Sequence, residues 1–121
     1  MDINYDCVRA LMLSIENKFD NGKMPFLIST VKIPGFSSDE IDYNSQRLAE
    51  NNYFVCDVKK PLQINGKKNT IYKISALSEK GHKLVYAIRD DEKWKQIKDK
   101  LSEHKTHTFI DLENAINEVA N

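Results

Sequence analysis

The sequence predicts one α+β domain. Its 121 residues have the length of a single domain, and three features define the class. Apolar residues recur at helical spacing in segments near both ends of the chain. Two strand-like segments flank the dipeptide Asn65-Gly66, which strongly favours a tight hairpin turn. A shorter alternating segment ends at Pro34-Gly35 and is typical of one more strand.

Composition and charge limit the partners and the cellular location that we expect for the protein. Hydrophobic residues make up 40% of the chain, and Lys+Arg and Asp+Glu number 18 each, so the formal net charge is zero. Any attraction to a polyanion must therefore come from a local patch. Cys7 and Cys56 lie in a helical and a strand pattern, and we expect both to be reduced, buried small hydrophobes. No secretory segment or long apolar run is evident, so we expect a cytoplasmic protein without a membrane partner.

The first predicted helix spans residues 3–19. We expect Asp2 to cap its start and Asn21-Gly22 to end it with a left-handed residue. A strand is predicted after it, with Leu27, Val31 and Ile33 on one face. The apolar residues at near-helical spacing in the first helix are Ile3, Val8, Leu11, Ile15 and Phe19.

The second predicted helix spans residues 37–52. Ser37 and Glu40 have the spacing of a capping box. Its inner face is thin and consists of Ile41 and Leu48, with Ser45 or Asn44 beside them.

A long β-hairpin is predicted from about residue 53 to about residue 77. Pro61 lacks a backbone N–H, so its arm is expected to be an edge strand or bulged, and the irregular face pattern also indicates a bulge. A two-residue turn at Asn65-Gly66 sets the register. The predicted pairs are Ile64 with Lys67, Val58 with Lys73, and Phe54 with Leu77.

Three helices are predicted after the hairpin. Ser78 caps the first, which continues to about Arg89, and Asp90 or Asp91 starts the second. Thr108 with Asp111 starts the last. The inward residues are Leu84, Val85 and Ile88 in the first, Trp94, Ile97 and Leu101 in the second, and Leu112, Ala115 or Ile116, and Val119 in the third.

This order of elements is that of a winged helix. We predict one domain, 1–121, in which residues 1–77 form a winged-helix-like core with the hairpin as its wing. Residues 78–121 add a C-terminal helical extension. A standard winged helix has two helices between its first strand and its wing, whereas one is found here. Residues 33–36 are expected to replace the other with a tight turn.

The stretch from Leu77 to Lys98 carries a specific resemblance. It combines Leu77-Ser78, Gly81-His82, an Ala-Ile-Arg-Asp-Asp run at residues 87–91, Trp94 and Ile97-Lys98. It resembles the C-terminal signature of a family of small uncharacterised proteins from bacterial prophages and other mobile elements. The resemblance covers most of residues 2–101 and implies a winged-helix-like fold, but no defined activity.

The same stretch contains residue types used in catalysis. Gly81 would lie in the first helical turn, where the absence of Cβ allows a close approach, and His82 is expected to face the sheet or the next helix. Arg89 is expected to pair with an aspartate and to stack on Trp94. A general base needs a partner and a cleft, and no nucleophile motif is present. We therefore predict a framework and not an enzyme, with no catalytic residues.

His104 and His107, beside Glu103, have a spacing found among metal ligands. A closed zinc site needs four ligands, and no second Cys or His pair accompanies them, so a polar loop is predicted here. No phosphate-binding glycine motif or zinc-protease motif occurs. We therefore expect no metal site and no cofactor.

A cluster of lysines is the feature of the sequence that favours a binding function. Residues 59–83 contain seven lysines and one acidic residue, and a basic wing is suited to phosphate contacts. The alternative is that edge-strand lysines only prevent aggregation. The predicted nucleic-acid-binding residues on the hairpin are Lys59, Lys60, Lys67, Lys68 and Lys73.

The second predicted helix has features both for and against nucleic-acid binding. Asn44, Gln46 and Arg47 are expected to face outward, and such side chains read base edges. The same helix carries four acidic residues and one basic residue, which would repel a phosphate backbone.

Two functions are therefore predicted. The first is a phage or mobile-element regulator that binds nucleic acid, with DNA favoured, in the bacterial host cytoplasm. The alternative is a protein-binding adaptor, or an inhibitor of a host enzyme or defence system, that meets a charged partner surface. The exposed face of the last helix, residues 109–120, is a possible homodimer contact.

Overall fold

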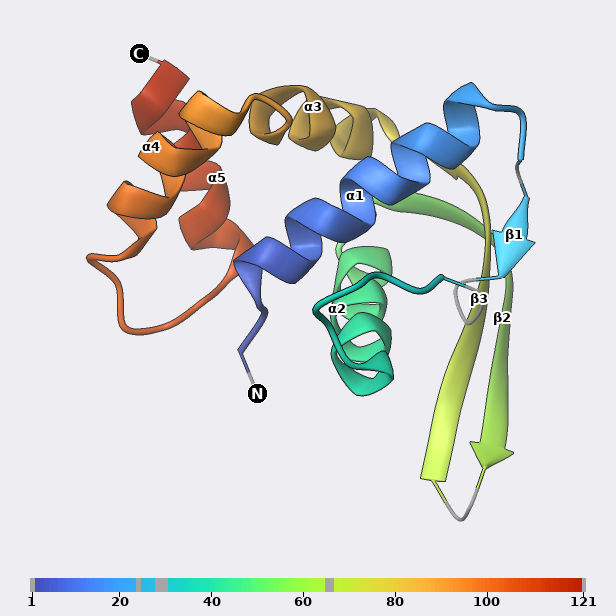
Figure 1. The fold of residues 1–121 in the computed structure, drawn as a ribbon. Helices are drawn as coiled ribbons and strands as arrows, with labels where there is room; N and C mark the ends of the chain where they lie inside the picture. Colours follow the sequence, from blue (N-terminus) through green and yellow to red (C-terminus); the bar gives the residue numbers. More distant parts are fainter. Residues whose placement is uncertain (1, 24, 28–30, 65–66, 121) are drawn as a thin grey trace.

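The computed structural model describes residues 2–23, 25–27, 31–64 and 67–120, with side chains described outside residues 27 and 57–72. These residues form helices and a small antiparallel sheet, so the predicted α+β class is confirmed (Figure 1). The elements in chain order are α1 (Tyr5–Asp20), β1 (Phe26–Leu27), α2 (Ser38–Glu50), β2 (Phe54–Ile64), β3 (Lys67–Leu77), α3 (Glu79–Ile88), α4 (Asp91–Leu101) and α5 (Phe109–Ala120).

Helix α1 lies at the centre of the helical part and contacts α2, α3 and β3. Its inner face is fully buried at Cys7, Val8, Leu11, Met12 and Ile15. This face carries the 3.6-residue periodicity from which the helix was predicted.

The start of α1 differs from the prediction and its end agrees with it. Asn4, and not Asp2, is the N-cap, because the Asn4 Oδ1 accepts a hydrogen bond of 3.1 Å from the Cys7 N–H. Asp2 is exposed. At the C-terminal end Gly22 has a φ of +66°, and the Lys23 N–H donates to the Lys18 carbonyl at 2.9 Å. Such a left-handed stop is the termination that Asn21-Gly22 predicted.

The described strands form one antiparallel sheet in the order β1-β3-β2. Among the described residues, Phe26 and Leu27 form β1 and pair with β3, opposite Ile74 and Lys73. Residues 28–30 of the predicted strand lie outside the described residues, and residues 31–33 are not in a strand. Val31 is nevertheless buried, with 6% of its surface exposed, so this segment contributes to the core as an irregular chain.

The hairpin has the predicted register. The three predicted pairs, Phe54 with Leu77, Val58 with Lys73 and Ile64 with Lys67, are all present. The predicted bulge is present too, since the register shifts between Val55 and Cys56 and shifts back before Val58. Strand β2 lies at the edge, as its Pro61 requires. The turn residues Asn65-Gly66 lie outside the described residues.

Helix α2 begins with the predicted capping box. The Glu40 N–H donates to the Ser37 Oγ at 3.1 Å, and the Ser37 N–H donates to the Glu40 Oε1 at 3.3 Å. One helix stands between β1 and the hairpin, as predicted. A tight turn precedes it, in which the Phe36 N–H donates to the Ile33 carbonyl at 3.3 Å and Gly35 has a φ of +92°.

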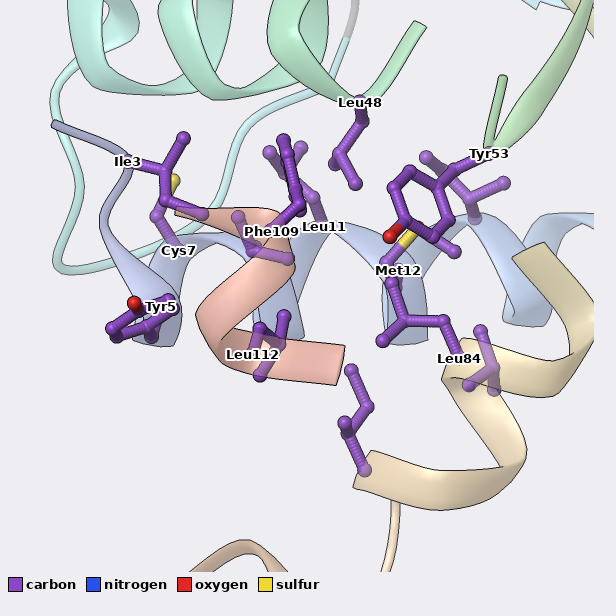
Figure 2. Close-up of a cluster of buried hydrophobic side chains, with 14 of the residues drawn as sticks. Ile3, Tyr5, Cys7, Leu11, Met12, Leu48, Tyr53, Leu84, Phe109 and Leu112 are labelled. Atoms are coloured by element: carbon purple, nitrogen blue, oxygen red, sulfur yellow. The ribbon is translucent and has the colours of Figure 1, made fainter. Parts of the chain in front are cut away.

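The three C-terminal helices begin at the predicted caps. The Ser78 Oγ accepts from the Gly81 N–H at 3.0 Å, the Asp90 Oδ1 from the Lys93 N–H at 2.9 Å, and the Thr108 Oγ1 from the Asp111 N–H at 3.1 Å. The helices share one core with α1 and α2. Figure 2 shows Phe109 and Leu112 of α5 in this cluster with Leu11 of α1 and Leu48 of α2. The predicted inward residues are buried in α3 (Leu84, Val85, Ile88), in α4 (Trp94, Ile97, Leu101) and in α5 (Leu112, Ala115), while Ile116 and Val119 are half-buried.

Gly81 explains how α3 meets the base of the hairpin. It is buried in the first turn of α3, and a Cβ built there would overlap the carbonyl oxygen of Tyr53. The same carbonyl accepts a hydrogen bond of 3.2 Å from the Ser78 N–H. The predicted close approach at Gly81 is therefore confirmed, and the group that approaches is a backbone carbonyl.

Replacement of Gly81 by alanine is expected to destabilise the fold by about 3 kcal/mol, because backbone cannot move aside as a side chain does. Urea unfolding followed by circular dichroism measures this. Lys83→Ala is the matched control in the same helix, since Lys83 is exposed, and its effect should stay within about 0.5 kcal/mol. Equal stabilities for the two variants would contradict the role assigned to Gly81.

Candidate nucleic-acid interface

The hairpin gathers the predicted basic residues on one ribbon. Lys59 and Lys60 lie on β2, while Lys67, Lys68 and Lys73 lie on β3. The register places Lys59 opposite Tyr72, Lys68 opposite Gln63, and Lys67 opposite Ile64. Both strands therefore carry lysines, and two of the pairs lie next to the turn. Lys73 is half-buried; the side chains of the other four lysines lie outside those that the structure describes.

The ribbon is fixed at its base and extends away from the helices. At the base, Phe54 and Leu77 are each 5% exposed and Ile74 is fully buried. The Ser75 hydroxyl also donates to the Val55 carbonyl at 3.1 Å, beside the bulge. In Figure 1 the hairpin runs beside α2 and continues past it. The apolar base anchors the ribbon, while its far end continues past α2.

Asn44 of α2 lies on the inner face beside Ile41 and Leu48, which is one of the two positions predicted for it, and the outward position expected of a base-reading residue is wrong. It is 2% exposed. Its Oδ1 accepts from the Asn4 N–H at 2.9 Å, and its Nδ2 donates to the Glu40 carbonyl at 2.8 Å. The position lies three residues after Ile41 and four before Leu48, so it belongs to the inner stripe of the helix. Asn44 ties the N-terminal segment to α2, and its burial keeps the amide away from a base.

Arg47 is partly exposed and already paired. Its guanidinium lies 2.8 Å from the Glu50 carboxylate and 5.1 Å from the centre of the Tyr43 ring. Gln46 is half-buried. Because Arg47 is the one basic residue in α2 and Glu50 offsets its charge, the helix adds little positive potential beside the ribbon.

Three of the four acidic residues of α2 lie towards its N-terminal end, and Glu50 is its last residue. Asp39 is exposed, and partial burial together with the charge of Asp39 raises the pKa of the Asp42 carboxyl. The net result is a helix with acidic character next to a basic ribbon, so the structure brings the two predicted groups of residues together without making them one basic surface.

We predicted that His82 faces the sheet or the following helix, and this prediction is wrong. It is exposed, and its ring meets the Phe19 ring edge-on with the centroids 5.5 Å apart. The reason is its place next to Gly81: the inward position is taken by Gly81 itself, so the neighbouring side chain points to solvent. The ring contact holds the end of α1 against α3.

Arg9 fastens the joint between α3 and α4, a role predicted for Arg89. The Arg9 Nε donates to the Ile88 carbonyl at 2.8 Å, and one terminal nitrogen donates to the Arg89 carbonyl at 3.0 Å. These are carbonyls at the end of α3 that lack helical partners. The guanidinium also lies 2.6 Å from the Asp91 carboxylate and 5.7 Å from the centre of the Trp94 ring.

Arg89 itself has a different environment. It lies over the exposed Tyr86 ring at 5.2 Å, and 3.8 Å from the Glu16 carboxylate. The general pattern, an arginine with an aspartate and Trp94, was thus predicted correctly but assigned to the wrong arginine. Arg9 is 79 or more residues away from its partners in sequence, and no local spacing could have identified it.

His104 and His107 have separate surroundings in the loop before α5. The His107 Nδ1 lies 3.3 Å from the Ile3 carbonyl, and its ring packs on Tyr5 at 4.9 Å. The His104 Nδ1 lies 4.0 Å from an Asp111 carboxylate oxygen. Within the described ranges, no group of three or more His, Cys, Asp or Glu side chains is arranged to hold a metal ion.

The two cysteines differ in burial. Cys7 is fully buried in α1, and burial raises the pKa of its thiol to about 11, so little thiolate forms near neutral pH. Cys56 is half-buried, so the expectation that both are buried holds for Cys7 alone. Cys7 is an inert core residue.

Tyr53 is an anchor that the sequence did not indicate. It is 1% exposed, and its hydroxyl donates to the Glu113 carboxylate at 2.7 Å. The Lys80 ammonium lies 4.4 Å from the centre of its ring and 3.7 Å from Glu113. Burial, and then the Glu113 carboxylate, raise the pKa of the Tyr53 hydroxyl above its ordinary value. This contact joins α3 and α5 at the base of the hairpin.

The fold and the ribbon together define a small α+β protein with a projecting basic hairpin. Residues 2–108 match the DUF2513 family, which is described as a hypothetical protein, and the chain belongs to this family. The match covers the hairpin and the Leu77–Lys98 stretch. No curated protein and no solved structure shows a significant match. In the part of the chain that the structure describes, no helix is long and apolar enough to span a membrane.

Loss of the Arg9 side chain is expected to cost about 2 kcal/mol of unfolding free energy, because two helix-end carbonyls would lose their donors. Arg9→Ala tests this by urea unfolding. The ion pair contributes little, since the Asp91 side chain is 93% exposed, so Asp91→Asn should change stability by less than about 0.5 kcal/mol. Arg89→Ala is the control for the other arginine. A larger loss for Arg89→Ala than for Arg9→Ala would overturn the assignment.

Proposed function

We propose that this chain is a winged-helix-like, non-enzymatic regulator that binds nucleic acid through its basic hairpin. The proposal combines two parts, the type of fold and the binding surface. Each is supported by different residues, and each can fail separately.

The winged-helix comparison is supported by the order and placement of the elements. Helix, strand, helix and hairpin follow one another as α1, β1, α2 and β2-β3. The short β1 pairs with β3, as the first strand of a winged helix pairs with its wing, and α2 lies beside β2. The tight turn at residues 33–36 stands where a standard winged helix has one more helix.

The observation that carries the binding proposal is a projecting two-stranded ribbon with lysines on both strands. A ribbon of this width can follow a nucleic-acid groove or backbone. Lysines that neutralise phosphates release counterions, which gives affinity without sequence information. The five proposed contact residues are Lys59, Lys60, Lys67, Lys68 and Lys73.

Helix α2 supports binding with little sequence preference. Asn44 is buried and Arg47 is paired with Glu50, so two of the three proposed base-reading residues are engaged within the protein. Gln46 keeps a secondary place in the proposal. Since base contacts specify sequence and phosphate contacts do not, we expect similar affinity for different duplexes.

A protein partner is the second candidate, and α2 favours it. Asp39 is exposed and Glu50 is a further exposed acid on the same helix. An acidic helix beside a basic ribbon is complementary to a protein surface that carries both charges, whereas it opposes a uniform polyanion. Under this alternative the chain is an adaptor, or an inhibitor of a host enzyme or defence system.

The setting completes the proposal. The resemblance of residues 77–98 to proteins of prophages and other mobile elements favours a role in the cytoplasm of a bacterial host cell, with no cofactor. A small regulator of a mobile element fits a chain of 121 residues with little room for a deep substrate cleft.

The double variant Lys67→Ala, Lys68→Ala is expected to bind duplex DNA more weakly and to do so equally for unrelated sequences. The slope of log affinity against log salt should fall by about two, because two phosphate contacts are lost. Fluorescence anisotropy over a series of salt concentrations measures both effects. Lys93→Ala, Lys95→Ala, on the exposed face of α4, is the matched control and should behave as the unaltered chain.

Three results would separate the candidates. Salt-independent binding, or no binding, would sink the nucleic-acid proposal. An equal loss in the α4 control would show that total charge, and not the hairpin, is responsible. Absence of DNA binding combined with a stoichiometric protein partner whose binding is lost on Asp39→Lys would favour the adaptor.

A further inference from the structure

The surface between α2 and the start of α5 has features that the proposed function does not use. A hollow of about 340 Å³ lies there, which we call the α2–α5 hollow. Helix α2 and its C-cap contribute every fourth residue, in the stripe Tyr43, Arg47 and Asn51. The remaining wall includes Ile3, Phe109 and Ile110. The hollow thus combines a polar stripe with an aliphatic and aromatic wall.

Ile110 stands out on the rim of the α2–α5 hollow. It is 71% exposed, although its neighbours Phe109 and Leu112 are 8% and 0% exposed and already anchor α5 in the core. A single exposed isoleucine is ordinary. Here it projects beside a hollow that is large enough to receive a side chain of its own kind.

The polar part of the α2–α5 hollow is not fully satisfied within the chain. The Arg47 Nε is buried and makes no hydrogen bond in the part of the chain that the structure describes. Buried donors without partners are uncommon, and each calls for an explanation. The Arg47 side chain as a whole is 42% exposed, so a carboxylate of a partner can approach it from this surface.

The charges around the hollow indicate what fits it. The rim carries both signs, with Asp2 exposed on one side and the partly exposed Arg47 with its partner Glu50 on the other. A polyanion needs an excess of positive charge and would meet two carboxylates here. A surface with both charges is complementary to itself, because a two-fold axis can bring the acid of one copy to the base of the other.

We propose that the α2–α5 hollow is a self-association surface, with a second copy of this chain as its occupant. In a two-fold contact each copy inserts Ile110 into the hollow of the other, and Asp2 of each copy faces Arg47 of its mate. The aliphatic contact provides the affinity, and the charges set the orientation.

This arrangement leaves the hairpins free. Figure 1 shows the hairpin on the side of α2 away from the start of α5 and the N-terminus. A dimer therefore presents two basic ribbons, and a second ribbon held on the same duplex raises the overall affinity without any new kind of contact. The self-association proposal does not depend on nucleic-acid binding, because it is tested on the protein alone.

Sedimentation velocity of the chain, over concentrations from micromolar to millimolar and without nucleic acid, tests the proposal. We expect a reversible dimer. Ile110→Glu should weaken dimerisation by roughly a hundredfold, because two isoleucines leave the contact and two charges enter it. Tyr86→Glu is the matched control, since Tyr86 is 70% exposed on α3, and it should leave the dimer unchanged.

Circular dichroism must show that both variants are folded, and Ile110→Ser replaces Ile110→Glu should the latter unfold. A second readout is the concentration dependence of amide chemical shifts, expected at Tyr43, Asn51 and Ile110 and absent at Tyr86. A chain that stays monomeric at all concentrations would overturn the proposal. A dimer that survives Ile110→Glu, or is lost equally in Tyr86→Glu, would overturn it as well.

Discussion

The approach of α3 to the Tyr53 carbonyl is the contact on which the arrangement of the helices and the hairpin depends. Tyr53 is the last residue before β2, and Ser78 and Gly81 open α3 immediately after β3. Both ends of the hairpin therefore meet one helix turn. The Ser78 hydroxyl reinforces this by donating to the Asn52 carbonyl at 2.5 Å, while the Tyr53 ring packs on Phe109 of α5. Only a residue without Cβ allows the backbones so close.

A fixed base matters for a ribbon that projects from a small domain. Two strands alone are marginally stable in water, so the hairpin needs its buried end to hold its shape. The core supplies this end through Phe54, Ile74 and Leu77. The two strands carry apolar residues at their base and lysines towards their far end. This division is the physical reason why we propose binding on the hairpin and not on the helices.

Local patterns predicted most of the fold, and contacts between distant residues explain what they missed. The capping box of α2, the caps of α3 and α4 and the hairpin register all follow from residues close together in sequence, and each was predicted. The sequence left Asn44 between the inner and the outer face, because its buried partner, the Asn4 backbone, lies 40 positions away. Arg9 was missed for the same reason, since its acceptors belong to a helix end that forms far along the chain.

For the candidate site, the sequence located the lysines and their strands, but it did not show which side chains of α2 are already engaged within the protein. Pairing of Arg47 with Glu50 and the inward turn of Asn44 depend on which face of the helix the core covers, and the thin apolar stripe left that face ambiguous. The structure has a basic ribbon beside an acidic helix, so the proposed phosphate contacts fall to the ribbon, with little help from the helix.

The most direct test of this account is a chemical-shift map of the isotope-labelled chain during titration with a short DNA duplex at low salt. The account predicts that the amides that shift lie on β2 and β3 from about Val58 to Lys73, with small changes on α4 and α5. Shifts centred on another surface, or none at saturating duplex, would contradict binding through the hairpin.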